Sequence, residues 1–174
     1  RLIERKNVDL FAEALKKMQF LQFLQFRMEA ESYDNLFSVI SNDLMHLKAL
    51  KLHFKCWRNC TEEIVALCSM LQMLLKRDIL ESLEIRCIAQ EIVPLMIDTV
   101  LKNNATNLRV FKLMGATFSA EHLERFFTLL ASNEMPHLRR LGLEIQSFES
   151  FLISSDLFFK SRASDFLCSL TLQM

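Results

Sequence analysis

The sequence has very few of the residues that make tight turns and phosphate-binding loops. Only two glycines and two prolines occur among its 174 residues. Loops that cradle phosphates with backbone N–H groups, and folds built from many tight hairpins, need glycine where other residues would be strained. The scarcity therefore argues against a glycine-rich nucleotide site and against an all-β fold of short hairpins.

Excess charge and long apolar runs are also lacking. Lysines plus arginines number 21, as do aspartates plus glutamates, so the formal net charge is zero. Nucleic-acid binding draws on a basic surplus that neutralises phosphates, so a nucleic-acid partner is not expected. No apolar run is long enough to cross a bilayer, and no signal peptide is recognisable, so we expect no membrane partner.

The cysteines number five and show no paired spacing, so a secreted form would carry an unpaired thiol. Two glycosylation sequons, Asn59–Thr61 and Asn104–Thr106, are short enough to arise by chance. We therefore expect a reducing compartment, the cytoplasm or the nucleus.

An internal repeat is the strongest signal in the chain. Its unit is an apolar residue, two variable positions, an apolar residue, one variable position and a third apolar residue. Six copies occur, and their central residues are separated by 26, 33, 28, 30 and 29 positions. The copies are Leu21–Phe26, Leu47–Leu52, Leu80–Ile85, Leu108–Leu113, Leu138–Leu143 and Leu167–Leu172.

Segments with helical periodicity lie between these copies. Thr61 and Ser119 place capping hydroxyls just before acidic residues, which is typical of helix starts, and Pro136 prevents a helix from continuing. The unit is therefore a short strand followed by a helix. The expected helices span approximately 7–18, 33–45, 61–77, 90–103, 119–132 and 149–160.

The six copies cover nearly the whole chain, and they resemble leucine-rich repeats of the ribonuclease-inhibitor-like class. The resemblance implies an α/β solenoid of about six strand–helix repeats, with a curved parallel sheet and helices on its convex side. The family usually has Asn or Cys three residues after the last apolar strand position. This chain departs from that pattern, so we expect irregular turns; the residues there are Glu29, Lys55, Ile88, Ala116 and Gln146.

An all-helical solenoid of the armadillo or HEAT kind is the alternative architecture, and the short, β-period copies disfavour it. The chain starts at Arg1 without a methionine and stops inside an apolar strand pattern. We therefore expect residues 1–174 to be a single solenoid segment of a longer chain.

The strand period decides which side chains are available for binding. Alternation across a strand turns the fourth and sixth positions of each copy inward. It turns the third and fifth positions, and the residue directly after each copy (the seventh position), toward the concave face. We predict that this concave face binds another protein. The candidate partner-binding residues are Phe23, Gln25, Arg27, Lys51, His53, Glu84, Arg86, Lys112, Met114, Arg140 and Glu144.

Two rows of these residues carry charge. Lys51, Glu84 and Lys112 alternate in sign along the fifth positions, which is also what a solvated ladder of ion pairs would show. The seventh positions of the first three copies are Arg27, His53 and Arg86, followed by Met114. A basic row beside an apolar residue suits an acidic, hydrophobic peptide or helix.

The stretch His53–Cys60 holds a histidine, two cysteines and the only tryptophan. A structural zinc site needs four ligands, commonly two pairs of cysteines, and no second pair follows. Cys68 lies among apolar helix residues, where we expect it to be buried, and Cys87 would have to approach from a neighbouring strand. We interpret the stretch as structural and expect no metal or other cofactor.

Enzyme motifs are not found in the sequence. No nucleophile elbow, HExxH motif or dinucleotide fingerprint occurs, and the four histidines are scattered. We predict no catalysis and no small-molecule substrate. The leading hypothesis is a protein–protein interaction module, for which the resemblance suggests the substrate-recognition part of a ubiquitin ligase. A structural segment buried in a larger assembly and an RNA-binding module stay open as alternatives.

Overall fold

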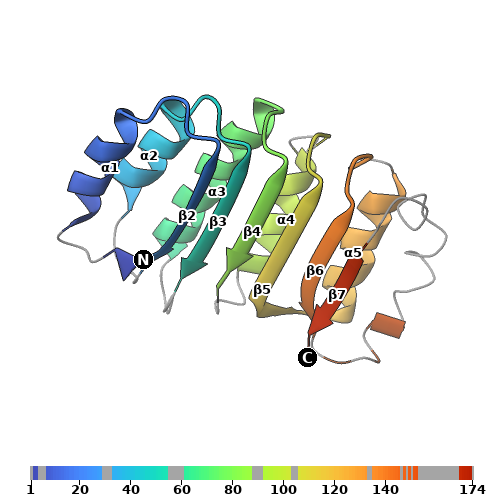
Figure 1. The fold of residues 1–174 in the computed structure, drawn as a ribbon. Helices are drawn as coiled ribbons and strands as arrows, with labels where there is room; N and C mark the ends of the chain where they lie inside the picture. Colours follow the sequence, from blue (N-terminus) through green and yellow to red (C-terminus); the bar gives the residue numbers. More distant parts are fainter. Residues whose placement is uncertain are drawn as a thin grey trace.

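The computed structural model describes residues 2–3, 7–28, 33–54, 61–87, 92–102, 106–132, 135–145, 147, 149, 151–152 and 169–173. Strands and helices alternate through these ranges (Figure 1). The strands are β1 (Leu2–Ile3), β2 (Phe23–Met28), β3 (Ala49–Phe54), β4 (Ser82–Arg86), β5 (Val110–Phe118), β6 (Arg140–Ile145) and β7 (Ser169–Gln173). The helices are α1 (Val8–Lys16), α2 (Asp34–Asn42), α3 (Thr61–Lys76), α4 (Ile92–Lys102) and α5 (Ala120–Ala131).

The strands form one open sheet whose spatial order is their order in the sequence, β1 to β7. Each neighbouring pair is parallel, so every connection has to cross back over the sheet. Figure 1 shows helices α1 to α5 along one face of the sheet, while no described element covers the other face. The predicted α/β class, with a parallel sheet alternating with helices, is confirmed.

The core lies between the sheet and the helices, and the strand period explains its composition. The fourth and sixth positions of the copies point toward the helices, as predicted; Leu83 and Ile85 on β4 are fully buried. On α5, the ring of Phe126 lies 5.6 Å from that of Phe111 and 6.2 Å from that of Phe118. Phenylalanine therefore fills the space between strand and helix in this repeat.

The helix ends agree with the predicted spans to within a few residues. Ser119 has extended backbone angles and caps α5 by accepting a hydrogen bond from the His122 N–H at 3.3 Å, as predicted. Thr61, expected just before a helix, is the first residue of α3. Most of the expected helix 149–160 lies outside the described residues, although residues 149 and 151–152 are helical.

Strand β5 departs from the regular pattern through a bulge. Leu113 pairs with Leu143, but the next pair toward β6 is Thr117 with Glu144. Gly115, inside the skipped segment, has a φ of +87°, a conformation that favours glycine. A Cβ atom at that position would lie 2.5 Å from the carbonyl oxygen of Cys87, the residue that follows β4. Glycine is therefore required here by both backbone conformation and space.

The bulge also changes the structure at one of the turn positions. Ala116, which occupies the position of the family's turn asparagine, lies inside β5 and is fully buried. The bulge is joined to β4 by a hydrogen bond from the Cys87 N–H to the Met114 carbonyl oxygen, 2.8 Å long. The strand of the fourth copy thus runs on for nine residues, where the repeat pattern predicts six or seven.

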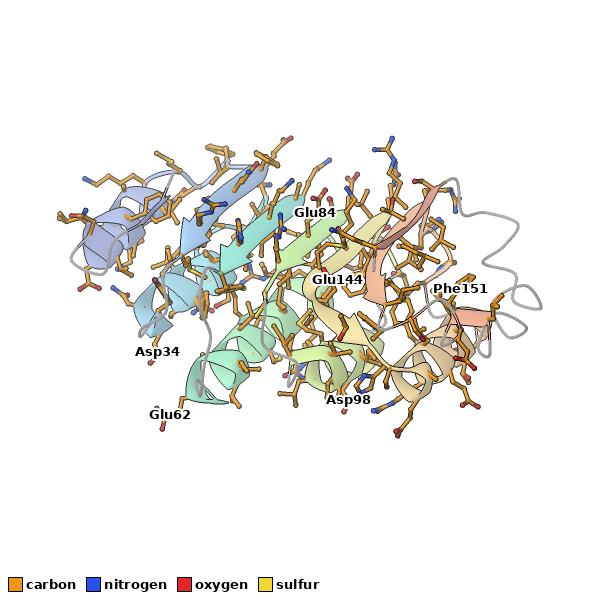
Figure 2. All side chains as sticks on the ribbon, turned by 90° about the horizontal axis from the view of Figure 1, so that it is seen from below. Asp34, Glu62, Glu84, Asp98, Glu144 and Phe151 are labelled. Atoms are coloured by element: carbon orange, nitrogen blue, oxygen red, sulfur yellow. The ribbon has the colours of Figure 1, made fainter. Side chains whose placement is uncertain are left out.

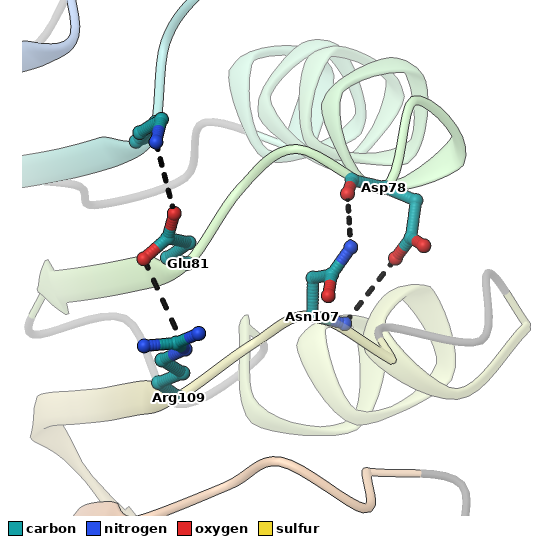
Figure 3. Close-up of polar contacts among 5 residues, drawn as sticks. Asp78, Glu81, Asn107 and Arg109 are labelled. Carbon is teal, nitrogen blue, oxygen red and sulfur yellow. Dashed lines mark hydrogen bonds and ion pairs between the residues drawn. The ribbon is translucent and has the colours of Figure 1, made fainter.

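At the edge where the strands begin, ion pairs and hydrogen bonds connect consecutive repeats (Figure 3). Glu81 lies between Lys48 and Arg109, with N···O distances of 3.3 and 3.9 Å. Asp78, at a positive φ of 54°, accepts hydrogen bonds from the Thr106 hydroxyl at 2.6 Å and from the Asn107 N–H at 3.2 Å. These contacts fix the connections that lead into β4 and β5.

Candidate functional site

The open face of the sheet, the one away from the helices, presents the predicted variable positions in register. The third and fifth positions of neighbouring copies pair with each other from β2 to β7, so each set forms a row across the sheet. Figure 2 shows Glu84 on this open face, whereas Asp34, Glu62 and Asp98 lie on the helix side. The predicted alternation holds from β2 to β5, where the fourth and sixth positions are buried and the third and fifth are not, but on β6 the fifth-position Gly142 is buried.

The fifth-position row is a ladder of alternating charge, as predicted, in which two lysines share one glutamate. The Glu84 carboxylate lies 3.0 Å from Lys51 Nζ and 3.2 Å from Lys112 Nζ. Burial alone would raise the pKa of the Glu84 carboxyl, but hydrogen bonds from both lysines, together with their charges, hold that pKa below its ordinary value. The Glu84 carboxylate is therefore ionised at neutral pH and is paired with both lysines.

The seventh-position row is basic and differs from the fifth in its partners. Arg27 Nε–H donates a hydrogen bond of 2.9 Å to Nδ1 of His53, which therefore acts as an unprotonated acceptor. Partial burial, and then the charges of Arg27 and Arg86, lower the pKa of His53. Within the described residues, no carboxylate forms an ion pair with Arg27 or Arg86.

Glu144 does not join this row in the way that its seventh position predicted. Because of the bulge in β5, Glu144 pairs with Thr117 and not with Met114. Its carboxylate accepts a hydrogen bond of 2.7 Å from the Gly115 N–H. The acid is thus bound to the backbone of the bulge, and the seventh-position register does not continue from Met114 to Glu144.

A groove with a volume of about 420 Å³ runs across the open face. Eight of the eleven candidate residues line it: Gln25, Arg27, Lys51, His53, Glu84, Arg86, Lys112 and Met114. The groove brings together residues from β2 to β5 that are far apart in the sequence. Phe23 and Arg140, both exposed third-position residues, and Glu144 lie outside this lining.

Gln173 on β7 is a groove residue that the candidate set lacks. It holds the seventh position of the last copy and pairs with Glu144, so the same repeat arithmetic could have included it. A second hollow of about 430 Å³ was not foreseen, and it lies where helices lead into β2 and β3. There the ring of Phe20, 81% exposed, stacks on His46 at 5.4 Å. The only feature of the sequence that could have indicated this hollow is an aromatic residue in the connection between a helix and a strand.

The described residues include no group of three or more His, Cys, Asp or Glu side chains that could hold a metal ion. Cys56, Trp57 and Cys60 lie outside the described ranges, so the interpretation of that stretch stays a prediction. Cys68 is half-buried, less than expected, and burial raises the pKa of its thiol. Cys87 is fully buried beside the bulge.

Comparisons of the chain with protein-family models, with curated proteins and with solved structures gave no match. Among the helices of the described ranges, none combines the length and the apolar character needed to cross a membrane.

Proposed function

We propose that this chain is a solenoid of the leucine-rich-repeat type that binds another protein through the open face of its sheet. The observation that supports this most directly is the groove, because all of its lining residues except Gln173 come from four consecutive strands in register. A surface assembled in this way presents side chains from several repeats to one extended partner. In this proposal the open face is the concave side of the solenoid.

The groove's chemistry suits a protein ligand. Cationic, anionic and amide side chains lie beside the half-buried Met114, and such mixtures of polar groups with methionine are common in protein–protein interfaces. A non-enzymatic role follows from the same interpretation. The narrower assignment, substrate recognition for a ubiquitin ligase in the cytoplasm or nucleus, rests on the resemblance and on the cysteine count alone.

Site-specific photo-crosslinking tests which face binds. A photoreactive phenylalanine analogue would replace Gln25 on the open face, and in matched variants Gln72 on α3 or Glu124 on α5. All three side chains are exposed, so each position should tolerate the probe. We expect one protein to crosslink from position 25 and not from the helix positions. Crosslinks from the helix positions alone would contradict binding through the open face.

A structural role in a larger assembly is the second candidate, and the helix side offers one observation in its favour. Large apolar side chains are exposed there, namely Leu10 on α1, Val65 and Met73 on α3, and Leu95 on α4. Covering them with another subunit would remove apolar surface from water. Crosslinks from positions 72 and 124, with none from position 25, would favour this role.

A further inference from the structure

Three rows of charged side chains cross the sheet, and two of them are internally paired. At the second positions, Glu81 of the third copy lies between Lys48 and Arg109. At the fifth positions, Glu84 of the same copy is paired with a lysine on each side. In both rows the third copy supplies the acid, and its two neighbours supply the bases.

The seventh positions break this rule, because the third copy supplies Arg86 where an acid would balance the row. His53 on β3 pairs with Arg27 on β2 and with Arg86 on β4, so the histidine lies between two arginines. The nearest acid in the row's sequence pattern is Glu144, and its carboxylate is held by the Gly115 N–H at the bulge. Within the described residues, the row is therefore cationic and has no carboxylate of its own.

The hydrogen bond between Arg27 and His53 leaves other N–H donors of the Arg27 guanidinium without an acceptor among the described residues. Arg27 uses Nε on His53, and no hydrogen bond among the described residues uses its two Nη nitrogens. A guanidinium held in this way can still bind a carboxylate through both Nη groups. Arg86 is exposed on β4, two strands from Arg27, so their backbones are about 10 Å apart at a strand spacing of about 4.8 Å.

We propose that the seventh-position row, Arg27, His53 and Arg86, is a receptor for the carboxylates of an acidic segment in the partner protein, with an apolar side chain of that segment beside Met114. This inference rests on the proposed protein-binding function and adds the chemistry of the partner. Two acidic residues seven apart on a helix share one face and match the spacing of about 10 Å. Each arginine then gains the carboxylate that the other two rows obtain from within the chain.

The charges favour a protein segment over nucleic acid. Among the described residues, Arg27 and Arg86 are the two fixed cations of the groove that form no ion pair, since Lys51 and Lys112 share Glu84. Nucleic-acid grooves instead neutralise a series of phosphates with many unpaired cations. The half-buried Met114 at the end of the row offers contact to an aliphatic side chain and no stacking platform for a base.

Fluorescence anisotropy with the intact chain tests the proposal. The probe is a labelled peptide of four Glu-Glu-Leu triplets, and the comparison ligands are the same peptide with Gln in place of Glu and a single-stranded RNA of equal length. The test variant is Arg27→Gln with Arg86→Gln. The matched control is Lys48→Gln with Arg109→Gln, which removes the same charge from the row paired with Glu81. Circular dichroism confirms that both variants fold.

We expect the acidic peptide to bind the unchanged chain, the glutamine peptide not to bind, and the test variant to lose about tenfold in affinity. The control should change affinity by less than about twofold, because its cations are already paired. The proposal is overturned if the acidic peptide does not bind, if both variants weaken it equally, or if the RNA binds more tightly through the same two arginines. If crosslinking at position 25 still captures a protein, such a failure concerns the partner's chemistry and not the open face.

Discussion

The edge where the strands begin and the groove near the strand ends use charged residues in opposite ways. At the starting edge, Glu81 forms ion pairs with the preceding and the following repeat, and Asp78 accepts hydrogen bonds from the following one. In the seventh-position row, the arginines face solvent with a histidine between them. The side chains at the starting edge are paired within the chain, whereas Arg27 and Arg86 form no ion pair with a described carboxylate. The comparison thus separates charges paired between repeats from charges that the proposed partner would pair.

The bulge in β5 keeps the Glu144 carboxylate away from the arginine row by binding it through the Gly115 N–H. A substitution that disrupts the bulge should have the largest effect on stability. In Gly115→Ala, the new Cβ atom would meet the Cys87 carbonyl oxygen at 2.5 Å, and the residue would keep a φ near +87°. We expect the free energy of unfolding to fall by about 3 kcal/mol. Urea denaturation followed by circular dichroism measures the change.

The other glycine provides the control for this variant. A Cβ at Gly142 would meet Lys112 Cγ at 2.9 Å, but that atom belongs to a flexible side chain that can move. Gly142→Ala should therefore cost less than about 1 kcal/mol. Equal losses for the two alanine variants would contradict the view that the bulge needs glycine at position 115.

Removing the tie at the strand-starting edge should have the next largest effect. Asp78→Ala deletes the acceptor of the Thr106 hydroxyl and of the Asn107 N–H while keeping a residue with a Cβ at positive φ. We expect a loss of about 2 kcal/mol in unfolding free energy. Asp78→Asn keeps an acceptor oxygen and tolerates this conformation, so it should lose less than about 1 kcal/mol. If thermal unfolding does not separate the two variants, the hydrogen bonds contribute little.

The paired rows were predictable from the sequence, and the bulge was not. A period of two residues decides which side chains of Leu80–Ile85 face inward, and equal spacing of the copies brings Lys51, Glu84 and Lys112 into one row. The bulge instead depends on a contact between Gly115 and the backbone of another strand. No local pattern encodes that contact, so the diversion of Glu144 could be seen only in three dimensions.

A smaller effect should distinguish the two paired rows from each other. Glu84 is more enclosed than Glu81, with side-chain exposures of 24% and 38%, and its ion-pair distances are shorter. We expect Glu84→Gln to lower the free energy of unfolding by about 0.5 kcal/mol, and Glu81→Gln to lower it by less. Denaturant titrations at low salt measure both, and a larger loss for Glu81→Gln would contradict this ranking.

The pH dependence of stability gives a further check on Glu84. Its pKa in the folded state is below the ordinary value of 4.5, so its contribution is fully present above that value. The contribution is then lost as the pH falls through the lowered pKa. The difference in melting temperature between the unchanged chain and Glu84→Gln should therefore shrink in acid, and a constant difference would show that the carboxylate's charge is not its source.

The smallest expected effect is the change in the pKa of His53, which reports on a row with no carboxylate partner among the described residues. Partial burial, Arg27 and Arg86 lower its pKa, so NMR should find the imidazole titrating below its ordinary value of 6.5. Arg27→Gln should raise this pKa, because a hydrogen bond to the neutral ring and a positive charge are both removed. Arg86→Gln should raise it less, since only a charge is lost, and the Lys48→Gln control should leave it unchanged. Because acid protonates Nδ1 and adds a positive charge to the row, the acidic peptide should bind more tightly as the pH falls through the pKa of His53, and a pH-independent affinity would exclude His53 from the receptor.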